Sequence, residues 1–314
     1  MLVHVGVLLL GLVVLYFGAE WLIKGASSMA VGLGIPPLVV GLTVVALGTS
    51  LPEFMTNFIA ALLGNDGLAL GNIIGSNIAN VGLILGTSAV LVPLAVAPTT
   101  LKREYPIMMG VMIAFYLLAL DGVIGRVDGV ILILGLVGFL GYLVRDVRRR
   151  GVGPDEVIAS PDLVMPTWKK TLLLVGGIGA LALGAHLMVT SAVAIAEFFQ
   201  IDPVIVGLTV VAVGTSLPEL AASLVGVFRN ETDLSVGNVI GSNLLNVLFV
   251  VGLVALVNPL RVEAEALVIH FPVMIGFGLL MLMAWFGHRL NRVHGIVLLL
   301  AFFSYMAFLV IPLL

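Results

Sequence analysis

The sequence contains no cysteine and few charged residues, and both absences narrow the class of protein. Without cysteine the chain cannot form disulfides, thiolate metal sites or a cysteine nucleophile. Charged residues make up 10% of the 314 residues, whereas they make up about a quarter of a typical soluble domain. Hydrophobic residues make up 61%. This composition indicates a protein that lies in a membrane.

The sequence also lacks the patterns of several functional classes. A net charge of −3 and the absence of basic stretches with interleaved aromatic residues exclude nucleic acid as a partner. No His-Glu-x-x-His, Gly-x-Ser-x-Gly or Gly-Lys-Ser/Thr motif occurs in the apolar runs. We therefore expect neither an enzyme nor a nucleotide-driven pump, and no cofactor.

Long apolar runs recur along the chain. About 20 apolar residues cross a bilayer as a helix, and backbone groups in lipid must bond internally. Barrel strands would alternate in hydrophobicity, which these runs do not. We expect an all-α integral membrane protein with ten transmembrane helices, at about residues 3–23, 38–63, 68–92, 104–121, 127–145, 170–190, 204–227, 234–257, 266–286 and 292–312.

The chain contains an internal repeat at a constant offset of 166 residues. Residues 39–53 and 205–219 are identical at 13 of 15 positions, and both contain Gly-Thr-Ser-Leu-Pro-Glu. Residues 71–80 and 237–246 are identical at 7 of 10 positions. The polar stretch between Arg145 and Lys170 separates the two copies. We expect a first five-helix repeat at 1–145, a linker at 146–169 and a second repeat at 170–314, with the motifs in segments 39–63, 68–92, 205–228 and 234–257.

Five spans per copy imply that the two repeats are inverted. Because five is odd, the second copy enters the membrane from the opposite side. Inverted repeats are common in secondary transporters, whose sites lie near the bilayer midplane on broken helices. We expect helices 2, 3, 7 and 8, which carry the motifs, to be broken.

The basic residues predict the orientation. Lys and Arg are retained on the cytoplasmic side. With the N-terminus outside, 12 of the 14 Lys and Arg residues face inward, and only Arg126 and Arg261 face outward. We expect a multi-pass protein of the cell membrane, with both termini outside and the linker 146–169 in the cytoplasm.

A carboxylate and two hydroxyls interrupt the second apolar run. Thr49 and Glu53 are four residues apart, so their side chains share one helical face. Pro52 cannot donate to the Gly48 carbonyl, and we expect it to loosen nearby carbonyls such as that of Ala46. The second copy repeats this arrangement with Ala212, Thr215, Ser216, Pro218 and Glu219.

The third and eighth runs each carry a polar stripe at four-residue spacing. The stripes consist of Asn72, Ser76 and Asn80, and of Asn238, Ser242 and Asn246. For Asn72 and Asn238, hydrogen bonding between helices is an equally good interpretation. Glycine pairs on both runs favour close helix approach, namely Gly71 with Gly75 and Gly237 with Gly241.

Glu53 and Glu219 are the strongest functional candidates. Ser, Thr and Gly in membrane helices mostly serve packing, but an intramembrane carboxylate is costly and is functional by default. Carboxylates, hydroxyls, amides and free carbonyls are all hard oxygen donors, which suit alkali and alkaline-earth cations.

These features resemble the cation/calcium exchanger superfamily. Two Gly-Thr-Ser-Leu-Pro-Glu motifs, each followed by Gly-Asn-x-Ile-Gly-Ser-Asn in a chain of five plus five spans, are most similar to the prokaryotic sodium/calcium exchangers. The resemblance implies two inverted five-helix repeats around a midplane ion cluster. It also implies that sodium entry drives calcium extrusion by alternating access, with Na⁺ and Ca²⁺ as the transported ions.

Matching motif positions imply a ligand set. Glu53 and Glu219 would bridge calcium with the carbonyls of Thr49 and Thr215. Asn80 and Asn246 would flank the centre, although similar exchangers often carry an acid at the position of Asn246. Ser50, Ser76 and the Ala46 carbonyl would line an inner sodium site, and Ser216, Ser242 and the Ala212 carbonyl its outer mirror.

The two carboxylates leave alternatives open. The same glutamates could carry protons, which would make the protein an H⁺/Ca²⁺ antiporter. Proton-coupled relatives usually have Gly-Asn-x-x-Glu, so the motif in this chain favours sodium. A passive cation channel is a further alternative, which the duplication argues against. The lipid bilayer is an expected partner, the oligomeric state is open, and a monomer suffices.

Overall fold

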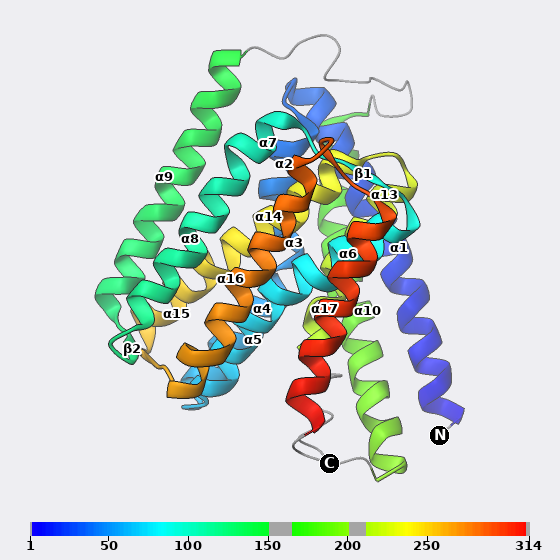
Figure 1. Cartoon of the computed structure of the whole chain (residues 1–314). Helices are drawn as coiled ribbons and strands as arrows, with labels where there is room; N and C mark the ends of the chain where they lie inside the picture. Colours follow the sequence, from blue (N-terminus) through cyan, green and yellow to red (C-terminus); the bar gives the residue numbers. More distant parts are fainter. Residues whose placement is uncertain (1, 151–164, 201–211, 312–314) are drawn as a thin grey trace.

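The computed structural model describes residues 2–150, 165–200 and 212–311, which form a bundle of helices (Figure 1). The described elements up to residue 150 are α1 (Leu2–Leu33), α2 (Pro37–Val40), η1 (Gly41–Val45), α3 (Ala46–Thr49), α4 (Leu51–Leu62), α5 (Asp66–Ala79), η2 (Asn80–Leu85), α6 (Gly86–Leu91), β1 (Leu94–Ala95), α7 (Pro98–Lys102), α8 (Glu104–Ala119), β2 (Val123–Ile124) and α9 (Arg126–Arg150). Segments η1 and η2 are π-helical.

The described elements after residue 165 follow the same order. They are α10 (Thr167–Phe198), α12 (Ala212–Thr215), α13 (Leu217–Phe228), α14 (Thr232–Leu245), η5 (Asn246–Val251), α15 (Gly252–Val257), β3 (Leu260–Arg261), η6 (Ala266–His270), α16 (Phe271–Leu280), η7 (Met281–Trp285), β4 (Arg289–Leu290) and α17 (Arg292–Val310). Segments η5 and η6 are π-helical, and η7 is a 3-10 helix.

The helical membrane class is confirmed. Seven described helices are long and apolar enough to cross a membrane, and the bent pair Pro37–Thr49 and Leu51–Leu62 makes up to eight. Of the other two predicted spans, 104–121 corresponds to α8, which has 16 residues. The span predicted at 204–227 lies partly outside the described residues. The total of ten spans therefore stays a prediction.

The outer helices are longer than predicted. Helix α1 continues to Leu33, although its apolar run was expected to end near residue 23. Residues 24–33 are rich in Gly, Ala and Ser, which lowers their hydrophobicity without preventing a helix. The helix ends where Gly34 adopts a left-handed backbone with φ +62 and prolines follow. Helix α10 likewise exceeds its predicted range of 170–190.

Two of the four expected helix breaks are present as bends or turns. The second span bends by 46° between α3 and α4. Ser50 and Ser216 have similar non-helical backbones, with φ/ψ of −84/3 and −90/6. The expected breaks in helices 3 and 8 are wrong, because Asp66–Leu91 and Thr232–Val257 are continuous. Each instead contains a π-helical segment, which widens a helix without ending it.

The two halves pair crosswise. Strand β1 pairs antiparallel with β4, and β2 pairs antiparallel with β3. The 166-residue offset relates β1 to β3 and β2 to β4. In each pair, a strand of the first half therefore pairs with the repeat equivalent of the other strand of that half. The start of α1 and the end of α17 lie at the same end of the bundle, whereas the C-terminal end of α9 lies at the opposite end (Figure 1).

Glycines bring α1 and α10 together in the same crosswise manner. A Cβ added at Gly11 would lie 3.0 Å from the Gly184 carbonyl oxygen, and one at Gly177 would lie 2.9 Å from that of Gly18. The offset relates Gly11 to Gly177 and Gly18 to Gly184. These contacts make the two helices antiparallel neighbours on one side of the bundle (Figure 1).

The motif-bearing helices form the centre. In the most apolar stretches of Asp66–Leu91 and Thr232–Val257, 78% and 83% of residues are buried, against 17% to 28% in the other long helices. Helix α14 packs on α2, η1 and α3, and an added Cβ at Gly237 would lie 2.6 Å from the carbonyl oxygen of Leu38 in α2. The polar stripes therefore lie inside the protein and not against lipid.

Candidate cation site

Two short helices begin at the centre of the bundle, and each carries a glutamate in its first turn. Helix α4 follows Ser50, and α13 follows Ser216. Both contain a proline near their first residue, which suits the start of a helix. The N-terminal end of a helix dipole favours negative charge, so these ends support the carboxylates of Glu53 and Glu219.

The two carboxyl groups meet in the protein interior. Glu53 and Glu219 are each 1% exposed, and their carboxyl groups are near enough to influence each other electrostatically. Ser50 Oγ donates to Glu219 Oε1 at 3.0 Å and lies 3.3 Å from Ser242 Oγ. Ser50 occupies an N-cap position, but it does not cap α4. Its hydroxyl serves the opposite half of the protein instead.

The threonines of the motif are held across the two halves. Thr49 Oγ1 donates to Asn238 Oδ1 at 3.2 Å, and Thr215 Oγ1 donates to Asn72 Oδ1 at 3.0 Å. The offset relates these two contacts to each other. Asn72 and Asn238 therefore form hydrogen bonds between helices, as one interpretation of these residues predicted.

Two further polar residues extend this network, and the sequence analysis missed them. Asn57 Nδ2 donates to the Glu53 carbonyl oxygen at 2.7 Å, and Asn57 Oδ1 accepts from Asn72 at 3.2 Å. In the other half, Ser223 Oγ accepts from Asn238 at 3.0 Å. Asn57 and Ser223 occupy equivalent repeat positions but differ in residue type, so identity between the copies did not reveal them.

The asparagines that end the polar stripes also pair across the halves. Asn80 Nδ2 donates to Asn243 Oδ1 at 3.1 Å, and Asn246 Nδ2 donates to Asn77 Oδ1 at 3.3 Å. All four side chains are at most 1% exposed. Asn77 and Asn243 belong to the repeated Gly-Asn-x-Ile-Gly-Ser-Asn motif, so the repeat itself was a signal for them.

Six buried oxygens in this region have no hydrogen-bond partner among the described residues. Every one belongs to a residue that the sequence analysis placed in the site. They are Glu53 Oε2, Glu219 Oε2, Ser76 Oγ, Ser216 Oγ, Asn80 Oδ1 and Asn246 Oδ1. Buried polar atoms are normally satisfied, and oxygens of this kind are the ligands that Ca²⁺ and Na⁺ take. The donor set fits hard cations.

The carboxylates are only two in number. The part of the chain that the structure describes contains no group of three or more His, Cys, Asp or Glu side chains that could hold a metal. Hydroxyl and amide oxygens therefore make up most of the potential ligands. Such a site would bind cations more weakly than one with several carboxylates, because fewer charges face the ion.

The Ala46 carbonyl differs from the expectation. It accepts from Ser50 N at 3.0 Å, so it is not free. Thr49 Oγ1, whose one proton is shared with Asn238 Oδ1, lies 3.3 Å from it. Pro52 removes the donor for Gly48 only, because the helical partner of Ala46 is Ser50. In the second half, Ser216 N donates instead to the Val213 carbonyl at 3.1 Å.

Parts of the second motif lie at the edge of the described residues. Ala212 begins α12, and nothing further about its environment is described. Gly237 and Gly241 pack closely on the first motif, as predicted, whereas Cβ atoms added at Gly71 and Gly75 meet no described atom within 4 Å. The segment that corresponds to 38–46 in the second copy is 204–212, and nearly all of it lies outside the described residues.

Comparisons with known proteins identify the family of this chain. The profile of the sodium/calcium exchanger protein family matches residues 3–145 and 169–311. The chain is 40% identical to the Alkalimonas amylolytica protein named "Putative antiporter CaxA", over 97% of this chain and 98% of that protein. It is 32% identical to the sodium/calcium exchanger MaX1 of Methanosarcina acetivorans, over 97% of each chain.

Solved structures show the same relationship. The structure of the sodium-calcium exchanger NCX_Mj soaked with 2.5 mM Na⁺ and 0.1 mM Ca²⁺ matches with a TM-score of 0.84 and 32% sequence identity, over 98% of both chains. The structure of NCX_Mj soaked without Na⁺ and Ca²⁺ matches with a TM-score of 0.85. With its paired buried glutamates and its match over both repeats, the chain belongs to the sodium/calcium exchanger family of multi-pass membrane proteins.

Proposed function

We propose that this protein is a secondary active antiporter that exchanges Na⁺ for Ca²⁺ across the cell membrane by alternating access. The observation that carries the proposal is the pair of adjoining buried carboxyl groups, Glu53 and Glu219, among six unpartnered oxygens. Membership of an exchanger family supports cation/Ca²⁺ antiport. Sodium as the counter-ion is supported by the name of the family and by the name of MaX1. Transport of this kind needs no cofactor.

We propose the ligand roles that the motifs predict. Glu53 and Glu219 hold Ca²⁺ between the two halves, helped by the Thr49 and Thr215 carbonyls, which end α3 and α12. The C-terminal end of a helix carries a partial negative charge that favours cations, so the ends of α3 and α12 suit a bound cation. The proposed sodium ligands form an inner set, Ser50, Ser76 and the Ala46 carbonyl, and an outer set, Ser216, Ser242 and the Ala212 carbonyl, with Asn80 and Asn246 beside the centre.

The two proposed sodium sets adjoin each other. Ser50 of the inner set lies 3.3 Å from Ser242 of the outer set. The Ala46 carbonyl already accepts from Ser50 N, so a sodium ion that binds it would shift the shared Thr49 proton fully to Asn238 Oδ1. The inner site is therefore proposed to form fully only when sodium binds.

We propose ten transmembrane helices arranged as two inverted repeats, at 1–145 and 170–314. The crosswise pairs β1 with β4 and β2 with β3 support a two-fold relation between the halves, as do the glycine contacts of α1 with α10. The family profile matches two separate segments that correspond to these halves. The positive-inside rule supports outside termini and a cytoplasmic linker at 146–169.

The charge of the site bears on the transport cycle. One Ca²⁺ with two ionised glutamates is electrically neutral, whereas three Na⁺ with the same pair leave one positive charge. A three-for-one exchange would therefore move net charge across the membrane. Exchange of one Ca²⁺ for two protons, carried by the same glutamates, would not.

Flux into proteoliposomes tests the proposal. An imposed Na⁺ gradient should drive ⁴⁵Ca²⁺ uptake, and Glu53→Gln or Glu219→Gln should abolish it, because each removes a charge that Ca²⁺ requires. The matched control is Glu197→Gln, which neutralises an exposed carboxylate on α10 and should transport as the wild type does.

The same vesicles separate the alternatives. Uptake that follows a pH gradient and ignores sodium would indicate the H⁺/Ca²⁺ antiporter. Calcium flux that depends on neither counter-ion would indicate a channel. If both glutamine variants retain wild-type exchange, the proposed site is wrong.

A further inference from the structure

We propose that two relays of buried side chains orient the amides of Asn80 and Asn246 so that their oxygens face the cations. This inference rests on the proposed function and adds positioning residues that touch no ion themselves. The first relay runs from Met274 through Asn77 to Asn246, and the second from Met108 through Asn243 to Asn80.

The first relay has a defined direction. Asn77 Nδ2 donates to Met274 Sδ at 3.6 Å, and Asn77 Oδ1 accepts from Asn246 Nδ2 at 3.3 Å. A thioether can accept a hydrogen bond but cannot donate one. The sulfur therefore requires the NH₂ group of Asn77 on its side, which leaves the Asn77 oxygen for Asn246. Asn246 must then offer its own NH₂ group, and its oxygen remains unpartnered in the protein interior.

The second relay repeats this order in the other half. Asn243 Nδ2 donates to Met108 Sδ at 3.6 Å, and Asn243 Oδ1 accepts from Asn80 Nδ2 at 3.1 Å. The Asn80 oxygen is likewise buried and unpartnered. The 166-residue offset relates every member of one relay to a member of the other, the methionines included. Two independent copies of the same sulfur-to-amide order argue against a chance contact.

The orientation matters because the two ends of a side-chain amide carry partial charges of opposite sign. The oxygen of an asparagine binds a cation, whereas its NH₂ group repels one. The two ends have similar shape and size, so packing alone selects weakly between them. A fixed acceptor at the far end of the relay makes one orientation better bonded than the other.

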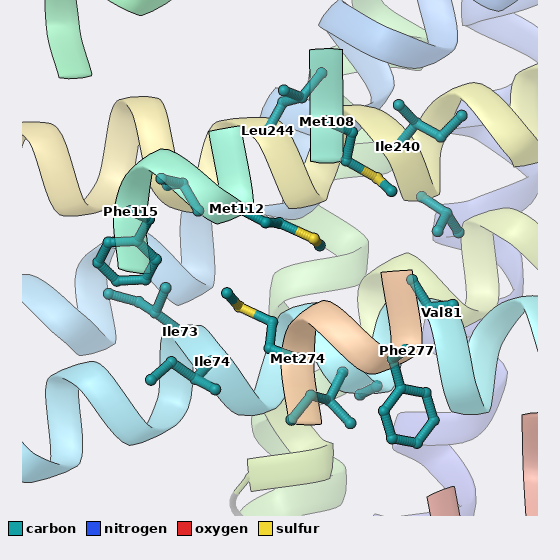
Figure 2. Close-up of a cluster of buried hydrophobic side chains, with 14 of the residues drawn as sticks. Ile73, Ile74, Val81, Met108, Met112, Phe115, Ile240, Leu244, Met274 and Phe277 are labelled. Carbon is teal, nitrogen blue, oxygen red and sulfur yellow. The ribbon is translucent and has the colours of Figure 1, made fainter. Parts of the chain in front are cut away.

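The described side chains around the methionines of the relays are apolar. Met108 from α8 and Met274 from α16 lie in an apolar cluster with Ile73, Ile240 and Leu244 (Figure 2). Both methionines and both relay asparagines, Asn77 and Asn243, are 0% exposed. Within this apolar cluster a methionine sulfur is the acceptor that each relay amide uses.

Removal of one sulfur tests the inference. Met274→Leu keeps the volume and apolar character of the side chain, which cores generally tolerate, but it removes the acceptor. We expect Kd for ⁴⁵Ca²⁺ binding to the purified protein in detergent to rise about two- to tenfold, the range of one neutral hydrogen bond. Met108→Leu should act similarly. The control Met112→Leu alters a buried methionine of α8 that lies in the same cluster, and it should bind as the wild type does (Figure 2).

A second background separates orientation from packing. Asn246→Asp replaces the amide with a carboxylate, which has no NH₂ group to present wrongly. In that background Met274→Leu should change Kd less than twofold. The inference is overturned if Met274→Leu binds Ca²⁺ as the wild type does, or if its effect is equal in both backgrounds. If the inference is overturned but the wild-type protein transports Ca²⁺, the proposed function still stands. If the wild-type protein neither binds nor transports Ca²⁺, the proposed function and the inference are both refuted.

Discussion

Substitution of Gly241 by alanine should destabilise the protein at the contact between its two halves. A Cβ at this position would lie 2.6 Å from the Leu42 carbonyl oxygen, 2.7 Å from Leu42 Cα and 2.8 Å from Ala46 Cβ. Carbon atoms in contact prefer separations of about 3.5–4.0 Å. Two of the three atoms are backbone, so a side-chain rotation cannot relieve the overlap. Helix α14 would have to move away from η1 and α3 by about 1 Å.

The expected cost follows from two opposing contributions. Overpacking of this kind costs about 1–3 kcal/mol, whereas replacing glycine by alanine inside a helix contributes at most about 1 kcal/mol of stability. We therefore expect a net loss of up to about 2 kcal/mol. The shift would also move Ser242 Oγ away from Ser50 Oγ, which lies 3.3 Å from it. It should therefore weaken cation binding as well.

Thermal unfolding of the purified protein in detergent measures the first effect. Gly138→Ala is the matched control, because Gly138 is exposed on α9 and an added Cβ there meets nothing within 4 Å. The control should keep or raise the apparent melting temperature, and Gly241→Ala should lower it. If Gly241→Ala melts at or above the wild-type temperature, the close approach of α14 to η1 and α3 is not as described.

Two further predictions concern transport. Ser50→Ala removes the donor to Glu219 Oε1, and since a hydrogen bond to a charged group is worth about 1.5–3 kcal/mol, the Na⁺ concentration for half-maximal Ca²⁺ uptake should change about 10- to 100-fold. Ser88→Ala, which truncates a buried serine outside the motifs, is its control, and equal behaviour of the two variants would contradict a role for Ser50. An imposed K⁺ diffusion potential should alter the rate of Na⁺-driven Ca²⁺ uptake if three Na⁺ exchange for one Ca²⁺. A rate that does not respond to the potential would instead indicate electroneutral exchange.

Much of the site was predictable because the repeat is visible in the residues themselves. The identity of 39–53 with 205–219 singled out Glu53 and Glu219, and the cost of charge in a membrane made them functional candidates. The structure buries both glutamates and brings their carboxyl groups together. Six unpartnered oxygens belong to predicted residues, whereas other buried oxygens without a partner, such as those of Ser27, Ser28 and Ser88, lie outside the predicted site.

Local patterns predicted helix ends and breaks less well. The end of α1 at Leu33 depended on Gly34 and the prolines after it and not on the fall in hydrophobicity near residue 23. The motifs in helices 3 and 8 suggested breaks, but both helices are continuous, and Asn80 and Asn246 each begin a π-helical segment inside them. Backbone groups that water cannot reach must form hydrogen bonds within the helix, so polar side chains alone do not break it.

The membrane class, the duplication and the oxygen chemistry of the candidate site follow from the residues alone, because hydrophobicity, residue identity and oxygen donors can be assigned position by position. The partners of these residues depend on the folded protein. The contacts of Thr49 with Asn238, and of Asn77 with Met274, join residues 189 and 197 positions apart. Such pairs arise from how the two halves pack together, and helical periodicity within either half does not predict them.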